Sequence, residues 1–129
     1  MKFAEIFESK WPFKNKNKIY NLMIREIDCG PFDGGCVVFA QALQKKYGGQ
    51  IVVLIGDRPT GQTAEHAALL LNNILIDADG PAEPKIFIQR FVKNEFYRWP
   101  IINIRPIRED DLPEAPRNQT LANMIAKLL

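Results

Sequence analysis

The chain has few cysteines, a single histidine and no long apolar run, and each scarcity excludes a class of protein. Only Cys29 and Cys36 occur among 129 residues. Two cysteines are too few for the disulfide framework of a small secreted domain, so we expect both thiols to be reduced. The sequence also lacks the roughly 20 consecutive apolar residues of a membrane span and the apolar core of a signal peptide. We therefore expect a cytoplasmic protein with no membrane partner.

An excess of charge of one sign is missing as well. The 17 basic and 15 acidic residues give a net charge of +2, and the two signs are interspersed along the sequence. Binding to nucleic acid or to an anionic membrane usually leaves a basic block or patch, which this pattern does not predict. We expect no nucleic-acid partner, and the charge of the chain does not identify any other kind of binding partner.

The length and the apolar content of 47% suit one domain over residues 1–129 with one core. Periodicity, glycines and prolines place the elements along the chain. Helices are predicted at 2–11, 19–30, 34–47, 83–99 and from Thr120, and strands at 50–56, 65–71, 74–78 and 101–105. We expect an α+β fold in which a central, N-terminally capped helix packs on an antiparallel sheet.

The third predicted helix begins with a cysteine. If Asp33 is the N-cap, Gly34, Gly35 and Cys36 are its first three residues, and the glycines leave the backbone N–H groups unobstructed. These donors and the helix dipole favour a thiolate at Cys36 and could also bind an oxyanion, while the carboxylate of Asp33 opposes a second negative charge. The alternative is that Cys36 is simply a small apolar core residue.

The only histidine lies on a predicted hairpin that also carries two acids. A two-residue turn at Asn72 and Asn73 places His66, Asp77 and Asp79 on one face of this hairpin. Asp79 then lies directly opposite His66 and Asp77 lies on the diagonal, at β-carbon separations of about 5 and 7–8 Å. Either carboxylate could orient the imidazole, or the histidine could be purely structural.

The order cysteine, histidine, acid resembles a papain-like fold in its transglutaminase-like or peptidase C39-like arrangement. The matching segments are 33–43, 65–67 and 74–80, so the resemblance covers about residues 30–80 and leaves a helix–strand–helix extension after it. It implies that Cys36 is the nucleophile, His66 the general base and Asp77 the orienting acid, with Asp79 as the substitute. It further implies a peptidase, amidase, deamidase or transglutaminase that acts on an amide or protein substrate without a cofactor.

Papain-like enzymes usually place a glutamine several residues before the nucleophile as an oxyanion donor. Positions 29 and 30 are cysteine and glycine here, which leaves Trp11, Tyr20 or a backbone N–H as candidates.

Two other functions remain open from the sequence. A papain-like scaffold could serve as a non-catalytic binding or effector module, in which the thiol and the imidazole need not meet. Alternatively, a group of four side chains could bind zinc, although the two cysteines of this group are further apart in the sequence than in the usual zinc sites. This group is Cys29, Cys36, His66 and Asp77 or Asp79.

Overall fold

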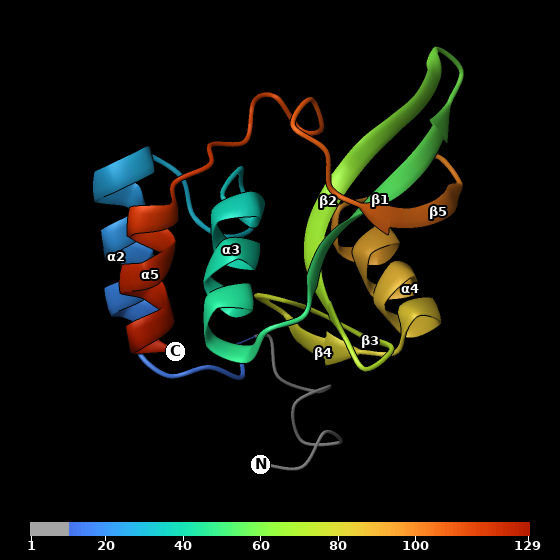
Figure 1. The fold of residues 1–129 in the computed structure, drawn as a ribbon. Helices are drawn as coiled ribbons and strands as arrows, with labels where there is room; N and C mark the ends of the chain where they lie inside the picture. The colour runs from blue at the N-terminus through green and yellow to red at the C-terminus, as the bar shows by residue number, and fades with distance from the viewer. Residues whose placement is uncertain (1–10) are drawn as a thin grey trace.

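The computed structural model describes residues 11–129 (Figure 1). The helix predicted at 2–11 lies outside the described residues, apart from Trp11. The described residues form a mixed α+β fold with four helices and a five-stranded antiparallel sheet. In chain order, the elements are α2 (Lys16–Ile27), α3 (Cys36–Tyr47), β1 (Gln50–Arg58), β2 (Gly61–Leu71), β3 (Ile74–Asp77), β4 (Gly80–Ala82), α4 (Pro84–Asn94), β5 (Ile101–Pro106) and α5 (Gln119–Leu128).

The strands of the sheet follow the order β4-β3-β2-β1-β5. The β-branched run in β1 lies inside the sheet between β2 and β5, as its composition predicts. The loop predicted at 57–63 is wrong, because β1 continues to Arg58 and β2 begins at Gly61, with these two residues paired across a tight turn. Gly61 has a φ of 128°, a conformation that glycine adopts readily, so the hairpin closes there.

The second hairpin matches its prediction in register. Asn72 and Asn73 have φ values of 50° and 62°, so a two-residue left-handed turn pairs Leu71 with Ile74. No strand is predicted after it, because glycine and proline at positions 80 and 81 usually break a strand. They form β4 instead, an edge strand, where a proline costs no ladder hydrogen bond.

Helices cover both faces of the sheet (Figure 1). Alternate residues of β2 and β3, such as Leu69 and Ile76, pack with α2, α3 and α5 on one face. Their neighbours, such as Ala68 and Leu75, pack against Phe87 of α4 on the other. Alternate strand residues thus pack on opposite faces of the sheet, and α3 is the central helix between the sheet and the pair α2 and α5.

Several helix ends differ from their predictions. The α2 helix spans Lys16–Ile27 instead of 19–30, and α3 begins at Cys36 instead of residue 34. The α4 helix ends at Asn94 instead of residue 99, and Phe96 has a φ of 50° and is 87% exposed, so it does not extend the apolar stripe. The α5 helix is capped by Asn118 and not by Thr120, because the Asn118 side chain accepts the Leu121 N–H at 3.0 Å.

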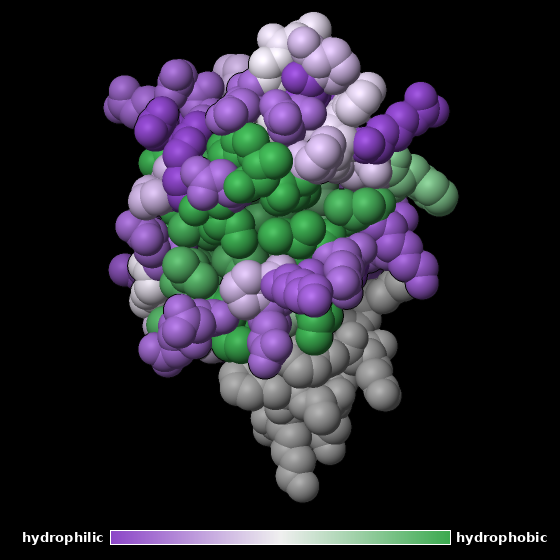
Figure 2. All heavy atoms as spheres, turned by 90° about the vertical axis from the view of Figure 1, so that its right-hand side faces the viewer, coloured by the Kyte–Doolittle hydropathy of each residue, from purple (hydrophilic) through white to green (hydrophobic). Residues whose placement is uncertain are grey.

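Apolar side chains gather on the surface seen in Figure 2, which is the side of the molecule where α4 and β5 lie in Figure 1. Ile86 and Ile102 of these two elements, together with Phe96, are among the exposed large apolar residues. Across residues 11–129, the helices are all too short or too polar to cross a membrane.

Candidate active site

The start of α3 carries Cys36 as its first helical residue. The prediction that Asp33 caps this helix is wrong, because its carboxylate accepts the Gly30 N–H at 2.5 Å and folds back onto the preceding loop. The N-cap is Gly35, and no side chain caps the helix. The thiol therefore lies at a helix N-terminus whose backbone donors are not taken by a capping carboxylate.

The glycine before Cys36 is required by space and not by conformation. Gly35 has a φ of −91°, which any residue adopts. A β-carbon at this position would lie 2.6 Å from the Gly30 carbonyl oxygen and 2.5 Å from Cε of Met23. The loop therefore packs directly against the backbone where α3 begins, which fixes the position of Cys36.

A β-bulge in β2 positions His66. Leu54 pairs with His66, but the next residue of β1 pairs with Ala64, which leaves Glu65 as the extra residue. The imidazole stacks on the ring of Phe91 at a centroid distance of 5.2 Å, and the His66 side chain is 13% exposed. An aromatic wall and the sheet thus hold the ring at the end of α3.

The carboxylate of Asp77 binds the imidazole. Its Oδ2 lies 2.8 Å from Nε2 of His66, while its Oδ1 accepts the Asp79 N–H at 2.8 Å and an Nη2–H of Arg90 at 3.2 Å. Arg90 also donates to the Gly80 carbonyl at 2.7 Å. The guanidinium therefore holds both the carboxylate and the turn that follows it.

The predicted position of Asp79 opposite His66 is wrong. The β2–β3 ladder ends at the pair Leu69 and Ile76, and the chain then turns so that Asp77 pairs with Gly80 of β4. Asp79 lies in this turn, where its carboxylate accepts from the side chain of Asn94 at 3.2 Å.

The thiol and the imidazole shift each other's protonation. Burial favours both neutral forms, because each charged group loses hydration. At Cys36, the nearby His66 imidazole and the N–H groups of Ala67 and Cys36 together outweigh burial and lower the pKa of the thiol. At His66, the hydrogen bond to Asp77 and the nearby Cys36 thiol together outweigh burial and raise the pKa of the imidazole. Both shifts favour a thiolate–imidazolium pair.

Cys29 has the opposite environment. Burial, followed by the nearby charge of Asp33, raises the pKa of its thiol. The carboxylate that was expected to oppose a thiolate at Cys36 thus acts on Cys29.

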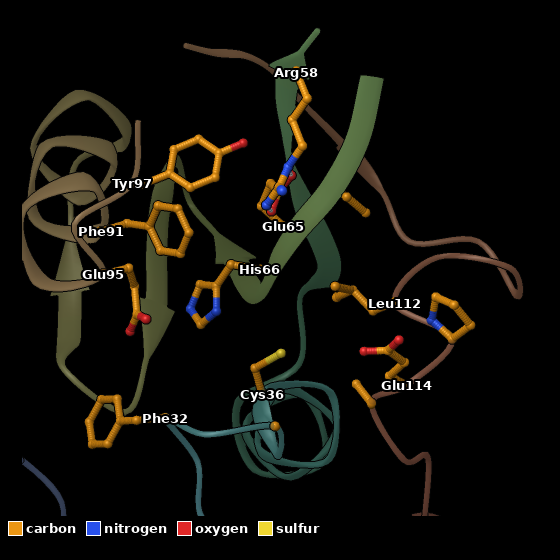
Figure 3. Close-up of a pocket in the computed structure, with 14 residues that line it drawn as sticks. Phe32, Cys36, Arg58, Glu65, His66, Phe91, Glu95, Tyr97, Leu112 and Glu114 are labelled. Atoms are coloured by element: carbon orange, nitrogen blue, oxygen red, sulfur yellow. Dashed lines mark hydrogen bonds and ion pairs between the residues drawn. The ribbon is translucent and has the colours of Figure 1, made fainter. Parts of the chain in front are cut away.

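Cys36 and His66 both line a cavity of about 550 Å³ (Figure 3). Nε2 of His66 binds Asp77, so Nδ1 is the ring nitrogen left for the thiol. The other residues that line the cavity are Phe32, Gly34, Arg58, Ala64, Glu65, Phe91, Glu95, Tyr97, Leu112, Pro113, Glu114 and Ala115.

An ion pair forms one wall of this cavity. Arg58 donates from Nε and Nη2 to the two carboxylate oxygens of Glu65, at 2.6 and 2.7 Å. These hydrogen bonds outweigh burial and lower the pKa of Glu65. The Tyr97 hydroxyl lies so close to Gly56 that a β-carbon there would be 1.8 Å from it. This glycine makes room for the tyrosine ring that lines the site.

The connection between β5 and α5 forms the opposite wall through Leu112 to Ala115. Asp111 anchors it, because its carboxylate accepts from Nη1 and Nη2 of Arg105 at 2.6 and 2.8 Å. Arg117 donates to the carbonyls of Leu112 and Asp111. The wall beside the thiol is thus fixed to the sheet by charged side chains.

The remaining candidates from the sequence lie elsewhere or do not form a site. Trp11 and Tyr20 do not line the cavity; their rings pack together at 5.4 Å. Within residues 11–129, histidine, cysteine and acidic side chains form no group of three or more that could hold a metal ion. The zinc ligand set that includes Cys29 is therefore not assembled in the described chain.

Sequence reasoning missed three contributors to the site. Arg90 had a usable signal, because it lies three residues after Phe87 and beside Phe91, on the covered face of α4, where an arginine needs an acidic partner. No sequence signal pointed to Tyr97 or to the 112–115 connection, because only the three-dimensional fold brings them to Cys36.

No protein family, curated protein or solved structure matches the chain.

Proposed function

We propose that the protein is a cysteine-dependent acyl-transfer enzyme with a papain-like arrangement of Cys36, His66 and Asp77. One observation carries the proposal: a thiol with a lowered pKa lies at a helix N-terminus and lines an open cavity together with an imidazole that a carboxylate orients. Nucleophile, base and orienting acid are the three roles that thiol acyl transfer uses.

The reaction would proceed through a thioester. The Cys36 thiolate attacks the carbonyl carbon of an amide, and the new carbon–sulfur bond converts the carbonyl into a tetrahedral oxyanion. The His66 imidazolium gives its proton to the departing amine as the carbon–nitrogen bond breaks. Water or an amine then attacks the thioester, His66 accepts the proton, and the thiolate leaves in its original state.

Backbone donors at the start of α3 would stabilise the oxyanion. Cys36 is the first helical residue, and its N–H belongs to the donors without a partner inside a helix. Oxyanion stabilisation by such groups contributes a large part of acyl-transfer catalysis. This assignment replaces Trp11 and Tyr20, which lie outside the cavity.

The proposal is tested by the reactivity of Cys36 across pH, measured in a Cys29→Ser background by mass spectrometry of the iodoacetamide adduct. We expect rapid labelling at neutral pH, with a midpoint well below the ordinary thiol value of about 8.5. His66→Ala should move that midpoint upward and slow labelling at neutral pH. An ordinary midpoint that His66→Ala leaves unchanged would contradict the proposal.

Turnover separates an enzyme from a binding module built on the same arrangement. A panel of peptide amides and glutamine peptides should be converted by the protein and not by Cys36→Ala. A reactive thiol without turnover of any amide or thioester would favour the binding module.

A further inference from the structure

We infer that the cavity selects a cationic amide, a peptide with lysine or arginine side chains on both sides of the attacked carbonyl, through Glu95 and Glu114. This inference rests on the proposed function, because it names the substrate of the same site. It is carried by the charges of the cavity walls, their placement around the thiol and the aromatic surface between them.

The charges that line the cavity do not balance. Three carboxylates, those of Glu65, Glu95 and Glu114, face it together with one guanidinium, that of Arg58. Both oxygens of Glu65 bind Arg58, so this pair is neutral. Within residues 11–129, the side-chain carboxylates of Glu95 and Glu114 form no hydrogen bond or ion pair. The cavity thus has two uncompensated negative charges, although the whole chain has a net charge of +2.

The two carboxylates lie on opposite sides of the thiol. Figure 3 shows Glu95 on the side of the His66 ring, with its carboxylate toward Phe32, and Glu114 on the other side of Cys36, beside Leu112, with its carboxylate toward Cys36. Glu95 follows α4 directly, and Glu114 belongs to the connection before α5. A substrate that presents its carbonyl to the sulfur therefore passes one carboxylate before the reacting bond and one after it.

The rest of the lining suits a long cationic side chain. The rings of Phe91, Tyr97 and Phe32 line the cavity, and aromatic faces bind both alkyl stems and cationic heads. Cζ of Arg58 lies 5.7 Å from the centroid of the Tyr97 ring, so the protein itself already contains a contact between a cation and an aromatic face at this site. The volume of about 550 Å³ is large enough for a few residues of a peptide. An anionic side chain would be repelled by Glu95 and Glu114, since the one guanidinium that lines the cavity is bound to Glu65.

The charge preference can be measured without turnover. Cys36 in the Cys29→Ser background is labelled with three methanethiosulfonates that carry a trimethylammonium-ethyl, a methyl or a sulfonatoethyl group, with rates normalised to those of free cysteine. We expect the cationic reagent to react at least about tenfold faster than the anionic one. Glu95→Gln and Glu114→Gln should each reduce this ratio about threefold, and the double variant should abolish it.

The matched control is Glu109→Gln. Glu109 lies on the same connection as Glu114 and is exposed, but it does not line the cavity. It removes the same charge from the chain and should leave the ratio unchanged. Equal rates for the cationic and anionic reagents, or a ratio that Glu109→Gln lowers as much as Glu114→Gln, would overturn the inference.

Protection of Cys36 then identifies the substrate class. Peptide amides with arginine, norleucine or glutamate on both sides of a central glycine compete with iodoacetamide labelling, and we expect the arginine peptide to protect best. Equal protection by the norleucine peptide would overturn the inference even if the protein turns over amides. Selective protection by the arginine peptide without turnover would support the charge preference and count against the proposed reaction.

Discussion

At the scale of single residues, the carboxylate of Asp77 has both oxygens occupied, one by His66 and the other by Arg90 and the Asp79 N–H. The Asp77 carboxylate stabilises the His66 imidazolium only while it faces the ring. A group that fixes this carboxylate therefore affects the thiol indirectly, through His66. Arg90 is in this sense a positioning residue and does not contact the sulfur.

We predict that Arg90→Ala slows iodoacetamide labelling of Cys36 at neutral pH and raises the midpoint of its pH profile. The variant should also lose about 1–2 kcal/mol of unfolding free energy, because the hydrogen bonds to Asp77 and Gly80 disappear. Arg90→Lys should restore part of the labelling rate. Arg98→Ala, which removes an exposed arginine after the same helix, serves as the control. A merely structural role would lower stability and leave the midpoint where it was.

The family resemblance selected Asp77 as the acid beside His66, and Asp77 is the acid that contacts the imidazole, whereas the hairpin register alone placed Asp79 directly opposite it. The turn at Asn72 and Asn73 gave the correct register for the hairpin. Extrapolating that register to Asp79 failed because β3 ends at Asp77 and the chain turns into β4. Register arguments hold only while the ladder continues, and a two-residue turn after Asp77 leaves no local pattern to reveal its end.

At the scale of elements, the start of α3 joins a tight loop to the helix that carries the nucleophile. Sequence spacing predicted this helix but assigned its cap to Asp33, because a carboxylate three residues before Cys36 suits capping. The Gly30 N–H competes for the same carboxylate and binds it. Whether the carboxylate binds the Gly30 N–H or the N–H groups at the start of α3 depends on the path of the loop, and no residue pattern specifies that path.

We predict that Gly35→Ala displaces this helix start. The new β-carbon would meet the Gly30 carbonyl oxygen at 2.6 Å, so the loop must shift, at a cost of about 1–3 kcal/mol in unfolding free energy. Labelling of Cys36 should slow as well. Gly48→Ala is the matched control at the other end of α3, where the left-handed φ of 76° makes alanine costly but nothing lies within 4 Å. Equal labelling rates in the two variants would contradict the displacement.

At the scale of the whole molecule, one sheet is covered on both faces, and the site lies where α3, α4 and the connection before α5 meet at β2. The sequence predicted the α+β fold, because its periodicities are strong within each element. It could not predict that the 112–115 connection closes one wall of the cavity, since this contact joins residues far apart in the chain. The charge pair between Arg105 and Asp111 holds the connection to β5, but it does not reveal that the connection lies beside Cys36.

We predict that Asp111→Asn destabilises the protein by about 1–2 kcal/mol at pH 7, because the bonds from Arg105 and the Arg108 N–H are weakened. Arg105 holds the pKa of the Asp111 carboxyl below its usual range. The stabilisation is therefore complete above the ordinary value of about 3.9 and is lost as the pH falls through the lowered native value. Chemical denaturation across pH should show the two proteins converging in acid. Asp110→Asn, the exposed neighbour, should cost little at any pH.

The most direct test of the thiolate–imidazolium pair uses the fact that the chain contains one histidine. Its imidazole gives a single set of side-chain resonances, which can be titrated by NMR in the unmodified protein and in Cys36→Ser. We predict that the unmodified protein keeps His66 protonated well above the ordinary pKa of about 6.5, and that Cys36→Ser lowers this pKa because the anionic partner is lost. An imidazole that titrates near or below 6.5 and is unaffected by Cys36→Ser would contradict the account.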